Sequence, residues 1–126
     1  MKKPSSPKER GLLKGAIRRV FSRSELRRQI LDKALVKDYH DPSRKRVTRW
    51  FKCPGCDKMT PAYLGEVDHK DPIIPPGKTL EDMEWTEVVD RVWCDESKLQ
   101  ALCKDCHKLK TRVENAERRK LKKEKK

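Results

Sequence analysis

Two cysteine pairs constrain this chain more than any other feature of its sequence. Cys53 and Cys56 form one Cys-x-x-Cys pair, and Cys103 and Cys106 form the second. Each pair places two thiolates on one side of a tight turn, and two such turns complete a tetrahedral four-sulfur site that suits Zn²⁺. Four thiolate ligands leave no open coordination position, so the predicted zinc is structural. The long stretch between the pairs must then form a substantial loop or subdomain.

The composition explains why such a metal site is needed. Of the 126 residues, 34% are hydrophobic and 42% are charged, so the chain buries only a modest core and needs a staple. No apolar run is long enough to span a membrane, and no apolar signal segment follows the basic start. We therefore expect a cytoplasmic protein with no membrane partner, in which cysteines bind metal rather than form disulfides. A redox role for one pair is the alternative, and Cys94 is expected to pack as a small apolar residue.

Positive charge is concentrated at the two ends of the chain. Residues 1–52 hold 17 Lys and Arg against 5 Asp and Glu, and residues 107–126 hold 10 against 3. Residues 53–106 hold 6 against 12, and the formal net charge of the whole chain is +13. Two basic arms around an acidic middle are typical of a protein that binds a polyanion. The alternative is that the lysine-rich ends only keep the chain soluble.

Hydrophobic periodicity predicts a mixed α+β chain. Residues 1–10 are expected to form a disordered basic tail. Apolar residues recur at helical spacing over 12–20, and a Ser-x-x-Glu capping box at Ser22 and Glu25 predicts a second helix that ends before Asp41. The later patterns predict strands at 44–52, 62–69 and 99–102, a short helix within 79–93, a helix from His107 onward and a basic tail at 118–126.

A carboxylate and two imidazoles form a candidate catalytic group. Asp68 and His69 end a predicted strand, where the usual alternation of side chains breaks and both can face one cleft. Asp68 can hold a divalent ion, and His69 can accept a proton near neutral pH. His107 follows Cys106 directly at a helix start, where consecutive side chains point about 100° apart. Cys106 can therefore face the zinc while His107 faces a second metal ion. The alternative for Asp68-His69 alone is a surface dipeptide.

Together these motifs resemble the HNH endonuclease family. The resemblance covers residues 53–114, and it rests on the Asp-His-x-x-Pro strand, the Leu-Gln-x-Leu strand that runs into Cys-x-x-Cys-His, and Lys110-Thr111. Members with flanking cysteine pairs are common among small bacteriophage nucleases. The resemblance implies a ββα-metal (His-Me finger) core with a four-cysteine zinc staple, preceded by basic N-terminal helices. One position departs from the family, because Lys98 stands where the family has an asparagine that braces the loop.

The resemblance also implies a function and a role for each site residue. The chain would be a metal-dependent endonuclease that hydrolyses phosphodiester bonds in double-stranded DNA, by nicking or double-strand cutting, with low or partial sequence specificity. Asp68 and His107 would hold the catalytic divalent ion (Mg²⁺, Mn²⁺, Ni²⁺ or Zn²⁺), and His69 would be the general base. Basic side chains on two helices are expected to contact phosphates: Lys108, Lys110 and Arg112 on the motif helix, and Arg27 and Arg28 on the N-terminal one.

The expected organisation follows from these assignments. Residues 1–10 are the tail, 11–49 a basic helical region, 50–117 the nuclease domain and 118–126 a second basic tail. The cytoplasm would be that of a bacterial host if the chain is phage-encoded. Two alternatives remain: a catalytically silent DNA-binding module, which the Lys98 departure favours, and a zinc-containing accessory protein that serves phage DNA packaging, with the acidic stretch 79–96 as its docking surface.

Overall fold

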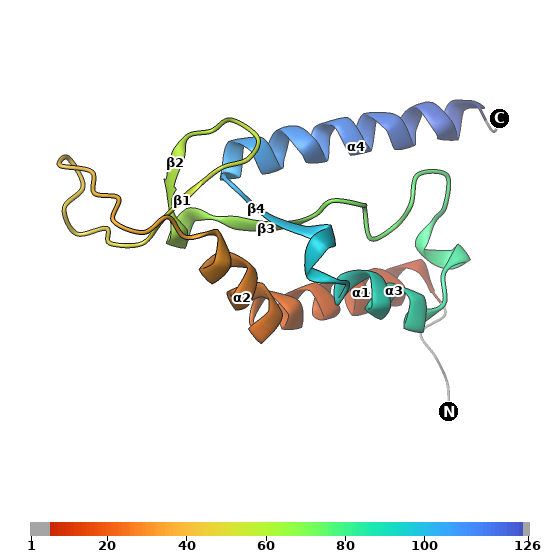
Figure 1. Cartoon of the computed structure of the whole chain (residues 1–126). Coiled ribbons are helices and arrows are strands. Elements are labelled where there is room, and N and C mark those ends of the chain that lie inside the picture. Colours follow the sequence, from red (N-terminus) through yellow and green to blue (C-terminus); the bar gives the residue numbers. More distant parts are fainter. Residues whose placement is uncertain (1–5, 125–126) are drawn as a thin grey trace.

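The chain forms a small α+β structure of four α-helices and two hairpin sheets within the residues described, 6–124 of a computed structural model (Figure 1). Residues 1–5 and 125–126, which belong to the two predicted tails, lie outside the described residues. The elements in chain order are α1 (Pro7–Ser22), α2 (Glu25–Ala34), β1 (Trp50–Lys52), β2 (Met59–Pro61), β3 (Glu66–His69), α3 (Trp85–Val92), β4 (Leu99–Leu102) and α4 (Lys104–Glu124).

The first helix begins earlier than the sequence predicted. Ser6 is its N-cap, and the Ser6 hydroxyl accepts a hydrogen bond from the backbone N–H of Glu9 at 3.1 Å. Pro7 follows in the first turn, where the fixed φ of proline and its missing N–H cost nothing. The prediction of a tail over 1–10 is therefore wrong for residues 7–10, because a local serine cap and a proline start the helix before any apolar residue appears.

The second helix has a different cap from the predicted one. Ser22 is still part of α1, and its hydroxyl donates to the carbonyl of Arg19. Ser24 is the N-cap of α2, with its hydroxyl accepting from the N–H of Arg27 at 3.2 Å. The predicted capping box at Ser22 and Glu25 is wrong because capping needs an extended residue with an oxygen acceptor, and the chain first leaves the helical conformation after Ser22.

The first hairpin is shorter than expected. Strand β1 pairs antiparallel with β2, and the last pair in the register is Trp50 with Pro61. The chain then turns into a short 3-10 helix over Ala62–Leu64, so residues 44–49 find no partner strand and are irregular. The strands predicted at 44–52 and 62–69 are thus confirmed only at their C-terminal ends.

The second hairpin forms the centre of the molecule. Strand β3 pairs antiparallel with β4, which sets Asp68 opposite Gln100 and His69 opposite Leu99. Helix α4 lies along one side of this hairpin, and α1, α2 and α3 lie on the other (Figure 1). The main hydrophobic core fills the second side, and its buried residues are Phe21, Ile30, Ile73, Met83, Val88, Val92 and Leu99. Because α4 follows the second hairpin directly, the end of β3 lies against the first turns of α4.

Helix α4 is longer than the sequence predicted at both ends. It begins at Lys104, three residues before His107, and it continues to Glu124. No proline or glycine interrupts this stretch, and its Ala, Leu, Glu, Lys and Arg residues are good helix formers. Arg118, predicted to begin a tail, donates from Nη2 to the carbonyl of Ile74 at 2.8 Å. The prediction of a tail over 118–126 is therefore wrong through residue 124. Across residues 6–124, none of the helices is both long and apolar enough for a bilayer crossing.

Candidate metal centre and active site

The four cysteines of the two Cys-x-x-Cys pairs come together as predicted. Their Sγ atoms all lie within 4.8 Å of one another, and the Cys56 and Cys103 sulfurs are 3.8 Å apart. Four sulfurs bound at 2.3 Å to one tetrahedral ion lie about 3.8 Å apart, so the cluster has the dimensions of a zinc site. Within the described residues it is the one group of three or more Cys, His, Asp or Glu ligands close enough to share an ion.

Local turns explain how the sulfurs converge. The Cys53 knuckle closes through hydrogen bonds from Asp57 N–H to the Cys53 carbonyl and from Cys53 N–H to the Lys58 carbonyl. Gly55 lies at its tip, where a Cβ would sit 3.0 Å from the Cys106 sulfur, so any larger residue would push that sulfur away by a few tenths of an ångström. The second pair comes from the end of β4 and the first turn of α4. The cluster therefore joins the first hairpin to the helix that follows the second.

Three thiols of this cluster have shifted pKa values. Burial works to raise the pKa of Cys53, but hydrogen bonds from the backbone N–H groups of Cys103, Cys56 and Gly55 outweigh it and lower that pKa to about 7. The pKa of Cys106 is raised, chiefly because its thiol shares hydrogen bonds with Cys103 and Cys53, and burial raises the pKa of Cys103. Without a cation, a thiolate is thus favoured at Cys53 and disfavoured at Cys103 and Cys106.

Asp68 and His107 meet at the end of the central hairpin. The Asp68 carboxylate is 6% exposed, and its Oδ2 accepts a hydrogen bond from Gln100 Nε2 at 2.9 Å. His107 Nε2 lies 4.0 Å from Asp68 Oδ1. A divalent ion about 2.1 Å from both atoms would lie almost in line between them, at an angle of about 145°, whereas ligand angles near about 90–110° are usual. The two side chains are therefore close enough to share one divalent ion after a small rotation of His107, while the Sγ of Cys106 belongs to the four-cysteine cluster.

His69 is held in one tautomer beside this pair. Its Nε2 lies 2.8 Å from the carbonyl oxygen of Val92, which can only accept, so Nε2 donates and Nδ1 carries the free lone pair. The ring packs on Phe21, with centroids 5.0 Å apart. Burial lowers the pKa of His69, although the Val92 carbonyl and Asp68 oppose that effect. The imidazole is thus neutral at pH 7 and able to take a proton.

Lys110 lies in this site rather than on the outer surface of α4. Its ammonium donates to the His69 carbonyl at 2.9 Å, lies 3.4 Å from Asp68 Oδ1 and forms an ion pair with Glu114. Burial alone would lower the pKa of Lys110, but the Glu114 and Asp68 carboxylates raise it. The sequence predicted a phosphate contact for Lys110, and that stays a prediction. In the folded chain Lys110 pairs with two carboxylates, because it lies about one helical turn after His107, on the face of α4 that meets the central hairpin.

Cations from both ends of the chain line the cleft around these residues. The cavity has a volume of about 450 Å³, and Lys14, Arg18, Arg27 and Arg118 contribute to its walls together with Asp68, His69 and His107. Burial, and then the charges of Arg18 and Arg118, lower the pKa of Lys14. The buried Nε of Arg118 has no hydrogen-bond acceptor among the described residues. Three carboxylates, those of Glu66, Asp68 and Glu114, line the same cleft, so its four Lys and Arg side chains leave only a small excess of positive charge.

Sequence reasoning missed Lys14, Arg18 and Arg118, as well as Gln100. The one available signal was the one-turn spacing of Lys14 and Arg18 on α1. Of the predicted phosphate contacts, Arg27 lines the cleft, whereas Lys108 and Arg112 are exposed on α4 and Arg28 is exposed on α2.

The loop that contains Lys98, where the HNH family has an asparagine, is braced by another residue. Lys98 is exposed, and the Asp95 carboxylate accepts a hydrogen bond from the N–H of Ser97 at 2.9 Å. The Lys98 carbonyl accepts from the N–H of Lys70 at 2.9 Å, which ties the loop to the end of β3. The loop is therefore held without an asparagine at position 98.

Thr111 lies one turn after His107 on α4. It donates its hydroxyl to the His107 carbonyl, so its side chain is engaged with its own helix.

Comparison of the chain with protein families, with characterised proteins and with solved structures finds no match. The resemblance to HNH nucleases therefore rests on the motifs, and the functional argument on the geometry described above.

Proposed function

We propose that this protein is a metal-dependent endonuclease that hydrolyses phosphodiester bonds in double-stranded DNA, with a ββα-metal active site stapled by a structural Zn²⁺. The observation that carries the proposal is the meeting of three side chains in one cationic cleft. Asp68 Oδ1 and His107 Nε2 lie 4.0 Å apart in the wall of that cleft, and His69, which also lines it, keeps its Nδ1 outside the hydrogen bond to Val92. Ligands for one divalent ion beside a neutral base are what hydrolysis of a phosphodiester requires.

Each side chain has a defined task in the proposed reaction. His69 takes a proton from a water molecule through Nδ1, and its hydrogen bond to the Val92 carbonyl keeps the ring oriented and stabilises the imidazolium that results. The water oxygen attacks phosphorus as the bond to the 3′ oxygen breaks, which leaves a 5′-phosphate and a 3′-hydroxyl. A divalent ion held by Asp68 and His107 would neutralise charge on the phosphoryl oxygens and on the departing oxygen.

Several other residues support these three. Gln100 fixes the Asp68 carboxylate, and Lys110 ties Asp68 to the main chain of His69. Lys14, Arg18 and Arg118 supply positive charge where a phosphate of the substrate would lie. Cys53, Cys56, Cys103 and Cys106 would hold the zinc and fix the start of α4, which carries His107. A closed four-thiolate site has no position for substrate, so its part is structural.

Cleavage of supercoiled plasmid tests the proposal. Zinc-loaded protein is incubated with plasmid DNA alone or with added Mg²⁺, Mn²⁺ or Ni²⁺, and nicked and linear forms are followed with time. We expect cleavage that depends on the added ion and that falls at least about a hundredfold in His69→Ala, which removes the general base. The matched control is His40→Ala, because His40 is exposed and lines neither the active-site cleft nor the cysteine cluster.

The outcomes separate the proposal from its rivals. If intact protein retards DNA in a gel but cleaves nothing with any ion, the protein is a silent DNA-binding module. If it neither cleaves nor binds DNA, the packaging-accessory alternative takes its place. If His69→Ala cleaves as fast as His40→Ala, the cleft described here is not the active site.

A further inference from the structure

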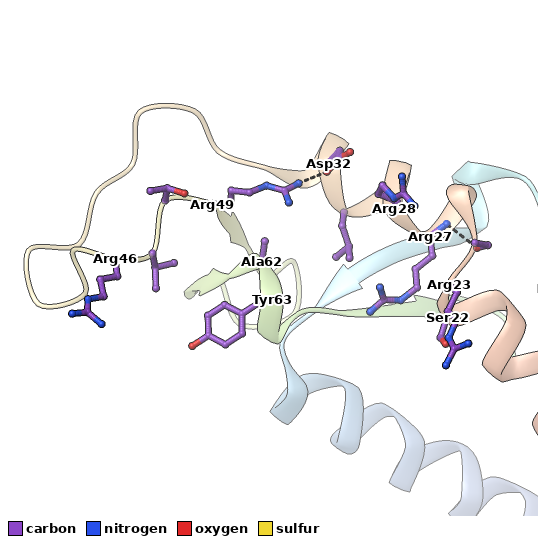
Figure 2. A pocket seen from close by; sticks show the side chains of 13 residues that line it. Ser22, Arg23, Arg27, Arg28, Asp32, Arg46, Arg49, Ala62 and Tyr63 are labelled. Carbon is purple, nitrogen blue, oxygen red and sulfur yellow. Dashed lines mark hydrogen bonds and ion pairs between the residues drawn. The ribbon is translucent and has the colours of Figure 1, made fainter.

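A second cleft, next to the proposed active-site cleft, is lined by arginines. It has a volume of about 610 Å³ and lies between the junction of α1 and α2 on one side and the irregular segment 46–49 with residues 62–63 on the other. Figure 2 shows this cleft from close by. Segments that are distant in the sequence build it, so no stretch of the chain reveals it alone.

The cleft has a large excess of positive charge. Five arginines line it, namely Arg23, Arg27, Arg28, Arg46 and Arg49, against a single carboxylate, that of Asp32. Asp32 forms an ion pair with Arg49, which leaves the other four guanidinium groups without a carboxylate in the lining. Like charges gathered around a cavity raise the local potential and favour an anionic ligand. Guanidinium groups bind phosphate oxygens in particular, because their fork of N–H donors matches the phosphate geometry.

The arginines are spread along the cleft rather than gathered at one point. Arg46 lies at one end, and Arg23 and Arg27 lie at the other, with the ring of Tyr63 between them (Figure 2). A single phosphate ion would call for donors that converge on one place. Charges spaced along an open cleft suit a polymer that repeats its negative charge, and the exposed ring of Tyr63 offers a surface on which a sugar can pack.

The arginine cleft adjoins the proposed active-site cleft. Ser22 and Arg27 line both cavities, so a strand bound in the active-site cleft would reach the second cleft across these two residues. We infer that the arginine cleft binds the sugar–phosphate backbone of the DNA substrate beyond the point of cleavage. This inference rests on the proposed function for the identity of the polymer. Backbone contacts of this kind fix position without reading bases.

Three arginines can be removed without touching the active site. The test variant is R23Q/R28Q/R46Q, which spares Arg27 because it lines both cavities and Arg49 because it pairs with Asp32. The matched control is R19Q/K37Q/K58Q, which removes the same charge from exposed positions outside both cavities. A third variant, R23K/R28K/R46K, keeps the charge and loses the guanidinium forks.

Binding is measured with zinc-loaded full-length protein and no added divalent ion, using the fluorescence anisotropy of a short labelled duplex over a range of salt. Each phosphate contact contributes about 0.9 to the slope of log K against log salt. The glutamine variant is therefore expected to lower that slope by about 2 to 3 and to weaken binding about tenfold or more at about 0.1 M salt. The control should change the slope by less than about 1, and the lysine variant should keep the slope of the intact protein.

Thermal melting confirms that all variants are folded before they are compared. If the glutamine variant binds duplex DNA like the control, the inference is overturned. It is also overturned if DNA binding is unchanged but self-association is lost in sedimentation, because an acidic protein surface is then the occupant. If the intact protein binds DNA and the variant does not, but neither cleaves with any ion, the arginine cleft stands and the proposed nuclease function fails.

Discussion

Substitution of Gly65 by alanine should destabilise the protein through one contact. Gly65 lies directly before β3, the strand that carries Asp68 and His69, and its φ of −74° suits any residue. A Cβ built on it would lie 2.7 Å from Cε1 and 3.1 Å from Cζ of Phe51. Phe51 is fully buried, with an exposed fraction of 0%, so its ring cannot move aside into solvent. The whole effect therefore comes from overpacking and not from backbone strain.

The magnitude follows from that geometry. Carbon atoms pack at about 3.5–4.0 Å, so the added methyl overlaps the ring by about 1 Å and forces a shift in the cluster that includes Cys53, Ala101 and Leu102. Overpacking of this kind costs about 1–3 kcal/mol. For a domain of this size about 1 kcal/mol corresponds to about 4 °C, so Gly65→Ala should lower the Tm by about 4–12 °C.

Thermal and urea unfolding by circular dichroism measures the effect, and the chain offers a matched control. Gly11 lies inside α1 with nothing within 4 Å of the position a Cβ would take, so Gly11→Ala should stabilise the protein by about 0.5–1 kcal/mol. The double variant Gly65→Ala/Phe51→Leu tests the contact directly, because the smaller side chain makes room. The coupling between the two changes should be favourable by at least about 0.5 kcal/mol. A Gly65→Ala protein that melts with the intact one, or strictly additive effects, would refute the reasoning.

Four further predictions concern the metal centre, the active site and the loop before α3. Zinc removal by a chelator, or Cys103→Ser, should abolish the cooperative thermal unfolding transition, because structural zinc contributes about 10–16 kcal/mol and a domain's net stability is only about 5–15 kcal/mol. An unchanged transition in protein that metal analysis shows to be free of zinc would contradict this. Arg91→Met removes two hydrogen bonds, of 2.8 and 2.7 Å, to carbonyls of that loop, and urea unfolding should show a loss of about 1–3 kcal/mol. Gln100→Leu removes the donor to Asp68 and should raise the Mn²⁺ concentration needed for half-maximal plasmid cleavage at least about tenfold, with no change if the carboxylate is not a ligand. Burial and neighbouring cations lower the pKa of Lys14, so its charge is unfavourable in the folded protein at neutral pH. Lys14→Met should therefore raise the Tm at pH 7, by a gain that shrinks as the pH rises toward the usual lysine pKa, and a lower Tm at pH 7 would contradict this. The same substitution should weaken DNA binding.

Spacing and periodicity in the sequence were enough to predict several local features of this protein. The two Cys-x-x-Cys pairs predicted a four-sulfur cluster, because only two residues separate the cysteines of each pair and a tetrahedral metal site needs both pairs. Helical geometry predicted that Cys106 and His107 face different sites, and the family resemblance implied that His107 meets Asp68; the structure places the Cys106 sulfur in the cluster and His107 beside Asp68. Helical spacing likewise predicted the four helices, although not where they begin and end.

The errors at the helix ends have a common cause. Ser22 and Ser24 are equally good caps by residue type, and which one ends the helix depends on where α1 stops packing against the core through Phe21. The last turns of α4 looked like a solvated tail because they are rich in lysine. In the folded protein the bond from Arg118 to the Ile74 carbonyl fixes the helix against the loop before α3.

The sequence by itself determined that four cysteines can form one cluster and that the chain is strongly basic, and it predicted Asp68, His69 and His107 as candidate catalytic residues. The tertiary structure alone decided which cations surround these candidates, because Lys14, Arg18 and Arg118 come from opposite ends of the chain and meet only when α1 and α4 pack on the central hairpin. It also turned Lys110 inward and brought Arg46 into one cleft with Arg23. Periodicity reports on neighbours within a few residues, whereas these sites are made by contacts across the whole chain.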